Sequence, residues 1–500
     1  MTEAQMTLEL THPDYENQVD KYELWQDLYD GGDAIEKKSQ SALVSVDATN
    51  TKRVNNYLPQ HAYESDAQYE IRKLRATYRN FAKPVTGVFL SAIWRKPPKR
   101  ELPDSLNKFV ENVDLQGSSA DEFFKEHDKN AGVKGVRFVL VDSTKVPEDV
   151  EVKTEADTKA IGIRPYFIYV DALNLIDWGF ERNEATGSIE LAYIVIRESV
   201  DEAPGPFEQH RRLTRYKVWT RSTWEVWENV ESATGQNEKT IAPKIMEEGT
   251  HELGKVPIVP IYYNRKKEMV GLSCFAEVDS LMKRIYCRDS ELDKSLFDAA
   301  VPLLVTVGMT QDDMEDFVRA SSSGLNIPEI GGSASYVEPS GNAFGSTRQA
   351  ILDDEKSIKE IVLRTIRPDS KVAESAESRR LDKQQLDSQL AGFSQNCEDA
   401  EKKCWELALK WIGGTGDIEV DYNDDFDVNG MTSDIIKVFM DMRAAGDISR
   451  GTLWEALDQG EMLPPGFDPD VEAEQIDEDR IREQRNNPNL TGLAGKFLTQ

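Results

Sequence analysis

The chain has 500 residues, of which 39% are hydrophobic and 30% are charged, and its formal net charge is −30. That length allows about two to four domains with a sizeable buried core, and the composition excludes an intrinsically disordered chain. The acidic balance also excludes tight binding of nucleic acid through phosphate neutralisation, because such binding needs clustered lysine and arginine.

The sequence predicts neither export, nor a membrane span, nor a disulfide framework. The first residues, MTEAQMTLELTHPDYENQ, lack a basic region followed by an apolar one, so we expect no signal peptide. No run of about 18 apolar residues predicts a span. The four cysteines form no C-x-x-C pair, so we expect them to be reduced and buried. They are Cys274, Cys287, Cys397 and Cys404.

The first hundred residues predict helices separated by a polar loop. Apolar residues at helical spacing predict a helix over residues 12–31, which ends at a pair of glycines. Residues 36–56 are polar and predict a loop. A second helix is expected over residues 65–81, interrupted at Pro84, with a helical continuation that stops before Pro97.

Between residues 105 and 265 the pattern changes to β type. A short helix over ADEFFKEHDKN precedes runs rich in Val, Ile, Tyr, Phe and Trp that turn-forming residues separate. These runs are GVRFVLVDS, RPYFIYVDALNLIDW, ELAYIVIRES, RRLTRYKVWT, STWEVWEN and VPIVPIYYN. They predict an α+β domain with a largely antiparallel sheet, and the charged residues 145–159 predict a surface loop.

The next part of the chain alternates long helices with one small β-rich module. Helices are predicted over residues 273–300 and 349–366, with strands and turns between them. A third long helix, residues 378–412, ends at glycines suited to a helix C-terminus. A small module between two long helices predicts a hairpin-like stalk with a cap at its tip.

Charge is distributed unevenly in the second half. Residues 414–485 contain 20 Asp or Glu against 6 Lys or Arg, and two short helices are expected there before a flexible tail. Residues 345–390, by contrast, contain 9 basic and 9 acidic residues. The balanced charge of this segment fits ordinary ion pairs between oppositely charged side chains on the faces of helices. In a ring of identical subunits, the same residues would instead form circles of charge.

Most sequence motifs typical of catalytic or ligand-binding sites are absent. The five histidines are scattered without an H-E-x-x-H motif, and neither a nucleophile elbow nor a phosphate-binding loop occurs. Residues 421–430 begin like a calcium loop, but Phe426 stands where glycine is needed and Thr432 where glutamate is needed. We interpret them as a solvated acidic turn, with a weak cation site left open. No catalytic residue, metal site or cofactor is predicted.

Four tryptophans in predicted strands admit two interpretations. They are Trp178, Trp219, Trp224 and Trp227. Interleaved arginine and lysine would suit stacking on nucleic-acid bases. Glutamates that follow directly in the sequence balance the positive charge of those residues. Packing of the tryptophans in a core or an interface is therefore the preferred interpretation.

Several segments together resemble one known family. They include HPDYENQVDKYELWQDLYDGGDAI, YLP, TGVFLSAIWRKPP, ELPDSLNKFVENVDLQGSSADEFFKE, RPYFIYVDALNLIDWGFER, VPIVPIYYN and GDISRGTLWEALDQGEMLPPGFDPDVEAEQI. In this order they resemble a subfamily of the portal proteins of tailed bacteriophages, long described only as a domain of unknown function. The resemblance covers most of residues 12–480 and rests on many weak motifs. It is least close at residues 145–159 and in the region between the first two long helices.

The resemblance implies an α+β subunit with an α/β wing, a stem of long helices, a small β-rich clip and a helical crown. On that template the wing covers residues 1–270, the stem helices 271–300 and 345–366, the clip 301–344 and a tunnel loop 367–377. A long helix of wing and crown covers 378–413, an acidic helical crown 414–485 and a flexible tail 486–500.

The resemblance also implies a non-enzymatic subunit of a closed ring, usually of twelve copies, at one vertex of the virion, assembled in the host cytoplasm. Double-stranded DNA would pass through it without sequence specificity. Terminase, a tail adaptor and the major capsid protein would be its partners, and no membrane or cofactor is involved. The channel and tunnel-loop candidates are Lys356, Lys359, Arg364, Arg367 and Lys371. The clip candidates for contact with adaptor or terminase are Asp312, Asp313, Glu315 and Glu329.

Two alternatives remain from the residues alone. The chain could be another head-completion or tail component, although such proteins are commonly smaller or richer in β structure. It could also be a metal-dependent DNA-processing enzyme, which would need a carboxylate or histidine cluster on rigid elements.

Overall fold

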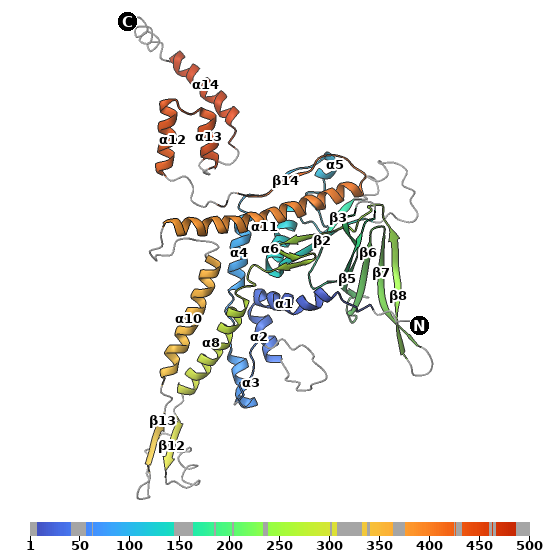
Figure 1. Cartoon of the computed structure of the whole chain (residues 1–500), viewed down its shortest axis with the longest axis vertical. Coiled ribbons are helices and arrows are strands. Elements are labelled where there is room, and N and C mark those ends of the chain that lie inside the picture. The colour runs from blue at the N-terminus through green and yellow to red at the C-terminus, as the bar shows by residue number, and fades with distance from the viewer. Residues whose placement is uncertain are drawn as a thin grey trace. The chain divides into compact units, whose positions relative to one another are not determined.

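The computed structural model divides into two compact units, residues 1–424 and 425–500, which are described separately (Figure 1). The described residues are 8–41, 57–62, 64–144, 164–184, 187–202, 205–233, 239–300, 303–307, 333–337, 341–363, 376–424, 426, 433–459, 463 and 467–486. Within these ranges, no helix is both long and apolar enough to cross a membrane.

Six helices lie in the amino-terminal part of the first unit. They are α1 (Pro13–Asp30), α2 (Gly32–Ser41), α3 (Asp66–Arg75), α4 (Ala82–Ile93), α5 (Asp104–Asn107) and α6 (Ala120–Lys134). The His12 ring accepts the Asp14 N–H at 3.1 Å to cap α1, which ends at Gly31 with φ 84°. Capping boxes begin α3 and α6, at Ser65 and Ser119.

The helix expected over residues 65–81 is shorter than predicted. α3 ends at Arg75, and Ala76 has extended backbone. Asn80 then accepts the Lys83 N–H at 3.0 Å, which satisfies a donor in the first turn of α4. Pro84 therefore lies inside the first turn of α4, where proline is tolerated, instead of interrupting a helix.

The predicted antiparallel sheet is in fact two main sheets. One has five strands in the order β4-β5-β6-β7-β8, and the other has three in the order β3-β2-β9. The strands are β2 (Val136–Ser143), β3 (Pro165–Val170), β4 (Leu175–Arg182), β5 (Ile189–Glu202), β6 (Arg211–Thr220), β7 (Thr223–Ala233), β8 (Lys239–Thr250) and β9 (Ile258–Tyr262). All neighbouring strands pair antiparallel.

The core of the first unit lies where α6 and the long helix α11 (Ala376–Trp411) contact the three-stranded sheet. Phe124 of α6, Phe138 of β2 and Trp405 of α11 are fully buried there. Phe167 of β3 packs edge-on against Trp405, with ring centroids 5.1 Å apart. This apolar contact holds α11 against the sheet.

A buried polar network fastens the end of α11 to its surroundings. Glu401 is fully buried and accepts hydrogen bonds from Trp405 Nε1 at 2.9 Å and from the Tyr422 hydroxyl at 2.8 Å. It also forms an ion pair with Arg100, which reaches Asp121 at 2.5 Å. Because every partner of Glu401 is on a different turn or element, the network fixes their relative positions.

Two short strands join distant parts of the chain. Strand β1 (Lys99–Glu101) pairs antiparallel with β14 (Glu419–Asp421), just beyond the end of α11. Tyr422 and Asn423 that follow are buried, and Asn423 donates to the Ala92 carbonyl at 2.9 Å. The start of the 421–430 segment is thus part of the packed body, not the solvated turn we expected.

The remaining elements form a hairpin in the first unit and the helices of the second. The hairpin comprises α8 (Asp279–Ala300), β12 (Leu303–Val307), β13 (Ser333–Val337) and α10 (Asn342–Leu363), and a small β10–β11 hairpin (Asn264–Lys267, Val270–Leu272) precedes it. The second unit has α12 (Ser433–Ala445), α13 (Arg450–Gln459) and α14 (Pro469–Asn486). The first two were predicted, and α14 was not.

Candidate functional site

The predicted stalk is a pair of antiparallel helices. α8 and α10 are 22 residues each and contact one another (Figure 1). Asp354 of α10 accepts from Arg284 Nη2 and from Arg288 Nη1, both at 2.5 Å, and Arg288 also donates to the Ala350 carbonyl at 3.2 Å. A later residue of α8 thus pairs with an earlier residue of α10, which fixes the antiparallel direction.

The predicted cap between the helices is a two-stranded antiparallel hairpin. Strand β12 begins three positions after the last residue of α8, and its Leu303 pairs with Val337 of β13. Chain connectivity places this pair of strands at the far end of the two helices, as Figure 1 shows. The sequence prediction of a small β module bracketed by long helices is confirmed for the described residues.

Among the described side chains of α8 and α10, the buried apolar ones lie in the first half of α8 and from the middle of α10 to its end. They are Met282, Ile285 and Tyr286 on α8, and Ile351, Ile358 and Val362 on α10. Farther along α8, Leu296 and Phe297 are 46% and 45% exposed. Arg75 of α3 lies over the Phe297 ring at 4.0 Å, and this contact is only partly shielded from water. The far half of α8 therefore presents apolar surface to solvent.

Ionic contacts brace the hairpin against the body. Arg79, between α3 and α4, forms ion pairs with Asp289 of α8 at 2.6 Å and with Glu355 of α10. Trp25 of α1 donates its indole N–H to Asp279, the first residue of α8, at 2.9 Å. α8 begins later than predicted because the residues before it bond elsewhere: Cys274 N–H donates to the Gly132 carbonyl of α6 at 2.9 Å.

Two predicted channel residues lie on the solvent side of α10. Lys356 and Lys359 are exposed, three positions apart on one face of the helix. Lys356 lies 3.6 Å from Glu360, an exposed pair that contributes little stability. The side of α10 that contacts α8 instead carries Ile351, Asp354 and Ile358. The structure thus separates a packing face from an exposed face that carries both lysines.

The other predicted site residues lie outside the described residues. They are Arg364, Arg367 and Lys371 of the expected tunnel loop, and Asp312, Asp313, Glu315 and Glu329 of the expected clip. Their predicted roles remain predictions.

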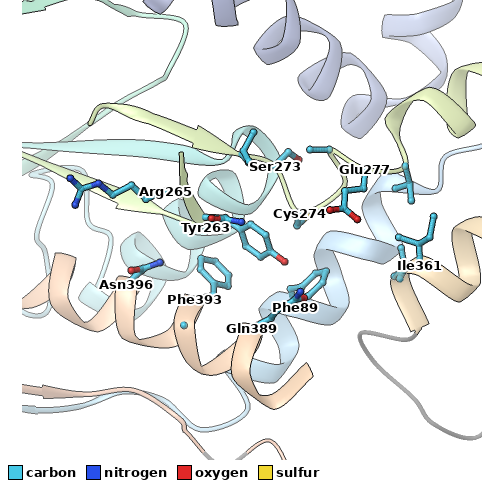
Figure 2. Close-up of a pocket in the computed structure, with 16 residues that line it drawn as sticks. Phe89, Tyr263, Arg265, Ser273, Cys274, Glu277, Ile361, Gln389, Phe393 and Asn396 are labelled. Carbon is cyan, nitrogen blue, oxygen red and sulfur yellow. The ribbon is translucent and has the colours of Figure 1, made fainter. Parts of the chain in front are cut away.

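A cleft of about 350 Å³ opens where the hairpin meets the body (Figure 2). One side is lined by Phe89 of α4, by Phe393 of α11 and by Tyr263, which follows β9. Another side is lined by Ile361, near the end of α10. The Tyr263 ring lies edge-on to Phe393 at 4.9 Å and to Phe89 at 5.4 Å. Helices α4, α10 and α11 and the residues just before α8 border this cleft, so a change in the angle of the hairpin would change its shape.

The cleft carries polar groups but no reactive thiol. Arg265, Glu277, Gln389 and Asn396 lie at its rim. Cys274 also borders it, but burial raises the pKa of its thiol to about 12, so the thiol is not a ready nucleophile. The cleft thus brings aromatic and polar side chains together at the junction of the hairpin with the body.

Among the described residues, no group of three or more His, Cys, Asp or Glu side chains is arranged to hold a metal ion. Cys397 and Cys404 are buried in α11, and burial raises the pKa of both thiols well above the ordinary value. All four cysteines are free, as expected, but only Cys397 and Cys404 are buried, whereas Cys274 and Cys287 are half-buried.

Sequence reasoning missed the residues that hold the hairpin together. Arg284, Arg288 and Asp354 were not singled out, and neither was Arg79, which the structure places between both helices. The spacing of four between Arg284 and Arg288 was a usable signal, since it places two guanidinium groups on one helix face. Nothing in the sequence indicates that Arg79, more than 200 positions away, reaches them.

Comparisons with known proteins cover the hairpin and α11 best. A family described as a domain of unknown function (DUF4055) matches residues 281–412, which run from the start of α8 to the end of α11. A search of curated proteins finds no match.

Solved structures give a distant similarity. Three come from a gene transfer agent (GTA) particle: the neck of the empty particle computed with C6 symmetry, the virion of the native particle, and the neck of the native particle computed with C12 symmetry. In each, one chain is 12% identical, with 77% of this chain and 90% of the other covered; the TM-scores are 0.40, 0.39 and 0.38. Because scores below 0.5 do not establish a common fold, the function is inferred below from this chain's own residues.

Proposed function

We propose that the chain is a portal subunit of a tailed-bacteriophage particle, and that identical copies close into a ring whose channel conducts double-stranded DNA during packaging, retention and ejection. The observation that carries the proposal is the α8–α10 hairpin with strands β12 and β13 between its helices. Each helix is about 33 Å long at 1.5 Å per residue, which suits the wall of a channel.

Exposed apolar surface supports association between copies. Leu296 and Phe297 on α8, and Ile71 and Leu74 on α3, are each about half exposed or more. Apolar surface of this kind is typical of positions that a partner covers. In the proposed ring, a neighbouring hairpin covers these positions, and the hairpin becomes rigid on assembly.

Electrostatics explain how such a ring would pass DNA without holding it. A dodecamer would carry roughly −360 formal charges, so most of its surface repels phosphates. A duplex then meets no deep binding minimum that a motor must overcome at each step. The exposed Lys356 and Lys359 of α10, with the predicted Arg364, Arg367 and Lys371, would form sparse rings of positive charge that centre or slow the duplex.

The described residues do not favour an enzymatic function. The polar groups of the deepest network, around Glu401, are paired with one another and buried away from any cleft. We propose that terminase and a tail adaptor dock on the ring and that the chemistry resides in those partners.

Particle imaging and mass measurement of the purified full chain test the proposal. A closed ring with a central channel is expected, with a mass equal to a whole number of subunits. A compact monomer at micromolar concentration would contradict it. Magnesium-dependent cleavage of duplex DNA by the purified chain would point instead to the DNA-processing alternative.

A further inference from the structure

The cleft at the junction of the hairpin with the body has the size and the walls of a small-ligand site (Figure 2). Its volume of about 350 Å³ lies at the low end of the range of about 300–1,000 Å³ that ligand sites occupy, so it suits a small ligand. Phe89 of α4 and Phe393 of α11 line it, and the Tyr263 ring adjoins both. These three rings give the cleft an aromatic wall.

Apolar side chains of the hairpin and of the residues just before it complete the lining. Val278 lies directly before α8, and Ile361 and Val362 lie at the end of α10. Val278 and Val362 are buried, whereas Ile361 is 38% exposed. A ligand in the cleft would therefore contact the aromatic wall of the body and the end of the hairpin at the same time.

Two polar groups that point into the cleft have no partner among the described residues. They are the Tyr263 hydroxyl and the Glu277 carboxylate (Figure 2). The hydrogen bond that Tyr263 does make is donated by its backbone N–H, to the Gly135 carbonyl at 3.0 Å. Burial, together with the nearby Cys274 and Glu277, raises the pKa of the Tyr263 hydroxyl, which therefore stays protonated. The cleft thus offers a neutral hydroxyl and a carboxylate to a ligand.

The charge of Glu277 is not balanced by a neighbouring cation. Among the described residues that line the cleft, Arg265 is the one cation, and it is paired with Glu268. The side chains of Gln389 and Asn396 at the rim are neutral amides. A carboxylate beside an aromatic wall, in a chain with a net charge of −30, favours a cation over an anion.

We propose that this cleft binds a small organic cation in which an ammonium group is joined to an apolar body. The ammonium group donates to the Glu277 carboxylate and to the oxygen of the Tyr263 hydroxyl. The apolar body lies against the three aromatic rings and Ile361. Because the ligand contacts α4, α11 and the end of α10, it holds the hairpin at one angle to the body. The site lies within a single copy of the chain, so the proposal does not depend on the proposed ring.

The test is a titration of the full chain, as purified, with phenethylamine, followed by calorimetry. Two matched probes accompany it: phenethyl alcohol has the ring without the charge, and propylamine has the charge without the ring. We expect saturable binding of phenethylamine with a dissociation constant on the order of 0.1–1 mM, as suits a ligand of this size. Each matched probe should bind at least about fivefold more weakly. Equal binding of phenethylamine and phenethyl alcohol, or binding that does not saturate, would overturn the proposal.

Substitutions locate the binding in the cleft. E277Q should weaken the binding of phenethylamine about five- to tenfold and change that of phenethyl alcohol by less than about twofold. The matched control E406Q, exposed on α11 and not part of the cleft, should change neither. Y263F keeps the ring and should weaken the binding of phenethylamine a few-fold. Melting curves check that each variant folds. Equal affinities in E277Q and E406Q would contradict the assigned role of the carboxylate.

Hydrogen exchange tests the effect of the ligand on the hairpin. Saturating phenethylamine should slow the exchange of amides at the end of α10 and in residues 389–396 of α11, and should leave those of β7 unchanged. The same concentration should slow them less in E277Q. Slower exchange confined to other parts of the chain would place the ligand elsewhere, and the absence of any binding to the folded parent would equally overturn the site.

Discussion

The body of the first unit and the hairpin that leaves it are stabilised in different ways. The body encloses large apolar side chains, such as Phe124, Phe138 and Trp405, and buries its polar groups in pairs around Glu401. The hairpin also buries apolar side chains in the part that adjoins the body, but its two helices are joined by Asp354 and two arginines whose side chains are 50% and 32% exposed. A region held by buried contacts is stable alone, whereas a region held by exposed ion pairs opens at lower cost. We therefore expect the hairpin to open at a lower free-energy cost than the body, and in the proposed ring neighbouring copies would stabilise it.

The largest expected effect comes from breaking the network in the body. Substituting Glu401→Ala leaves Arg100 as a buried charge without its main partner, and it removes the acceptor of Trp405 and Tyr422. We expect a loss of about 3–5 kcal/mol in the free energy of unfolding, measured by chemical denaturation. The exposed Glu406→Gln on the same helix is the control, with an expected change below about 0.5 kcal/mol. Similar losses of unfolding free energy in the two variants would contradict a special role of the Glu401 network in the stability of the body.

A second prediction concerns the pH dependence of the body. Burial raises the pKa of Asp128 to about 7, against 3.8 for the free side chain. As pH rises from about 4 to 7, the unfolded chain releases this proton while the folded chain keeps it, so Asp128 lowers stability by up to about 4 kcal/mol over this window. The loss is complete above about pH 7.

The variant Asp128→Asn tests this, because asparagine resembles the protonated acid and still accepts the Trp94 indole N–H. The variant should gain stability relative to the parent between pH 5 and pH 8, measured by denaturation at each pH. The exposed Asp104→Asn should show no such trend. A constant difference between Asp128→Asn and the parent across this range would show that the buried carboxyl does not retain its proton.

A smaller effect is expected when a substitution weakens the ion pairs of the hairpin. Asp354→Asn weakens the contacts with Arg284 and Arg288, which are partly screened by water, so we expect a local loss of about 1–2 kcal/mol. Hydrogen exchange measures it: amides of α8 and α10 should exchange faster while those of α6 and β2 stay protected. Asp353→Asn, on the neighbouring exposed position, is the matched control. Uniform acceleration across the body would contradict the separation of the two regions.

The smallest effect is expected on the exposed face of α10. Reversing charge in K356E/K359E should leave folding and assembly unchanged, because both side chains are exposed. In assembled particles, we expect a change of a few-fold in DNA retention, roughly the loss of two phosphate contacts per subunit. The pair K402E/K403E, exposed on α11, is the control. Equal retention in the parent and in K356E/K359E would argue against a role for these lysines in the channel.

Much of the helical fold follows from local signals. The ends of α1 and α11 were predicted from glycine pairs, and the hairpin from two long helices around a β-rich module. α3 stops early because tertiary contacts of residues 76–81, such as the Asn80 side chain with the Tyr29 carbonyl at 2.8 Å, replace helical bonds. Local propensity does not contain such contacts.

The missed elements lack an apolar pattern of their own. Strand β8 is charged and carries Pro243, and it is a strand because β7 pairs with it at the edge of the sheet, where proline is tolerated. α14 is polar almost throughout, so periodicity does not reveal it. The tryptophan interpretation is confirmed for Trp178 and Trp219, which are buried, whereas Trp224 and Trp227 are only half-buried. A cleft of about 630 Å³ between the two main sheets was not predictable, because it depends on how the two sheets face each other.

A map of the assembled chain, with α8 and α10 traced, tests the account most directly. The account predicts a closed ring in which the Lys356–Lys359 face of α10 borders a central channel wide enough for a DNA duplex, and in which a neighbouring subunit covers Leu296 and Phe297. A monomer, or an assembly in which that face of α10 is turned away from any channel, would contradict it.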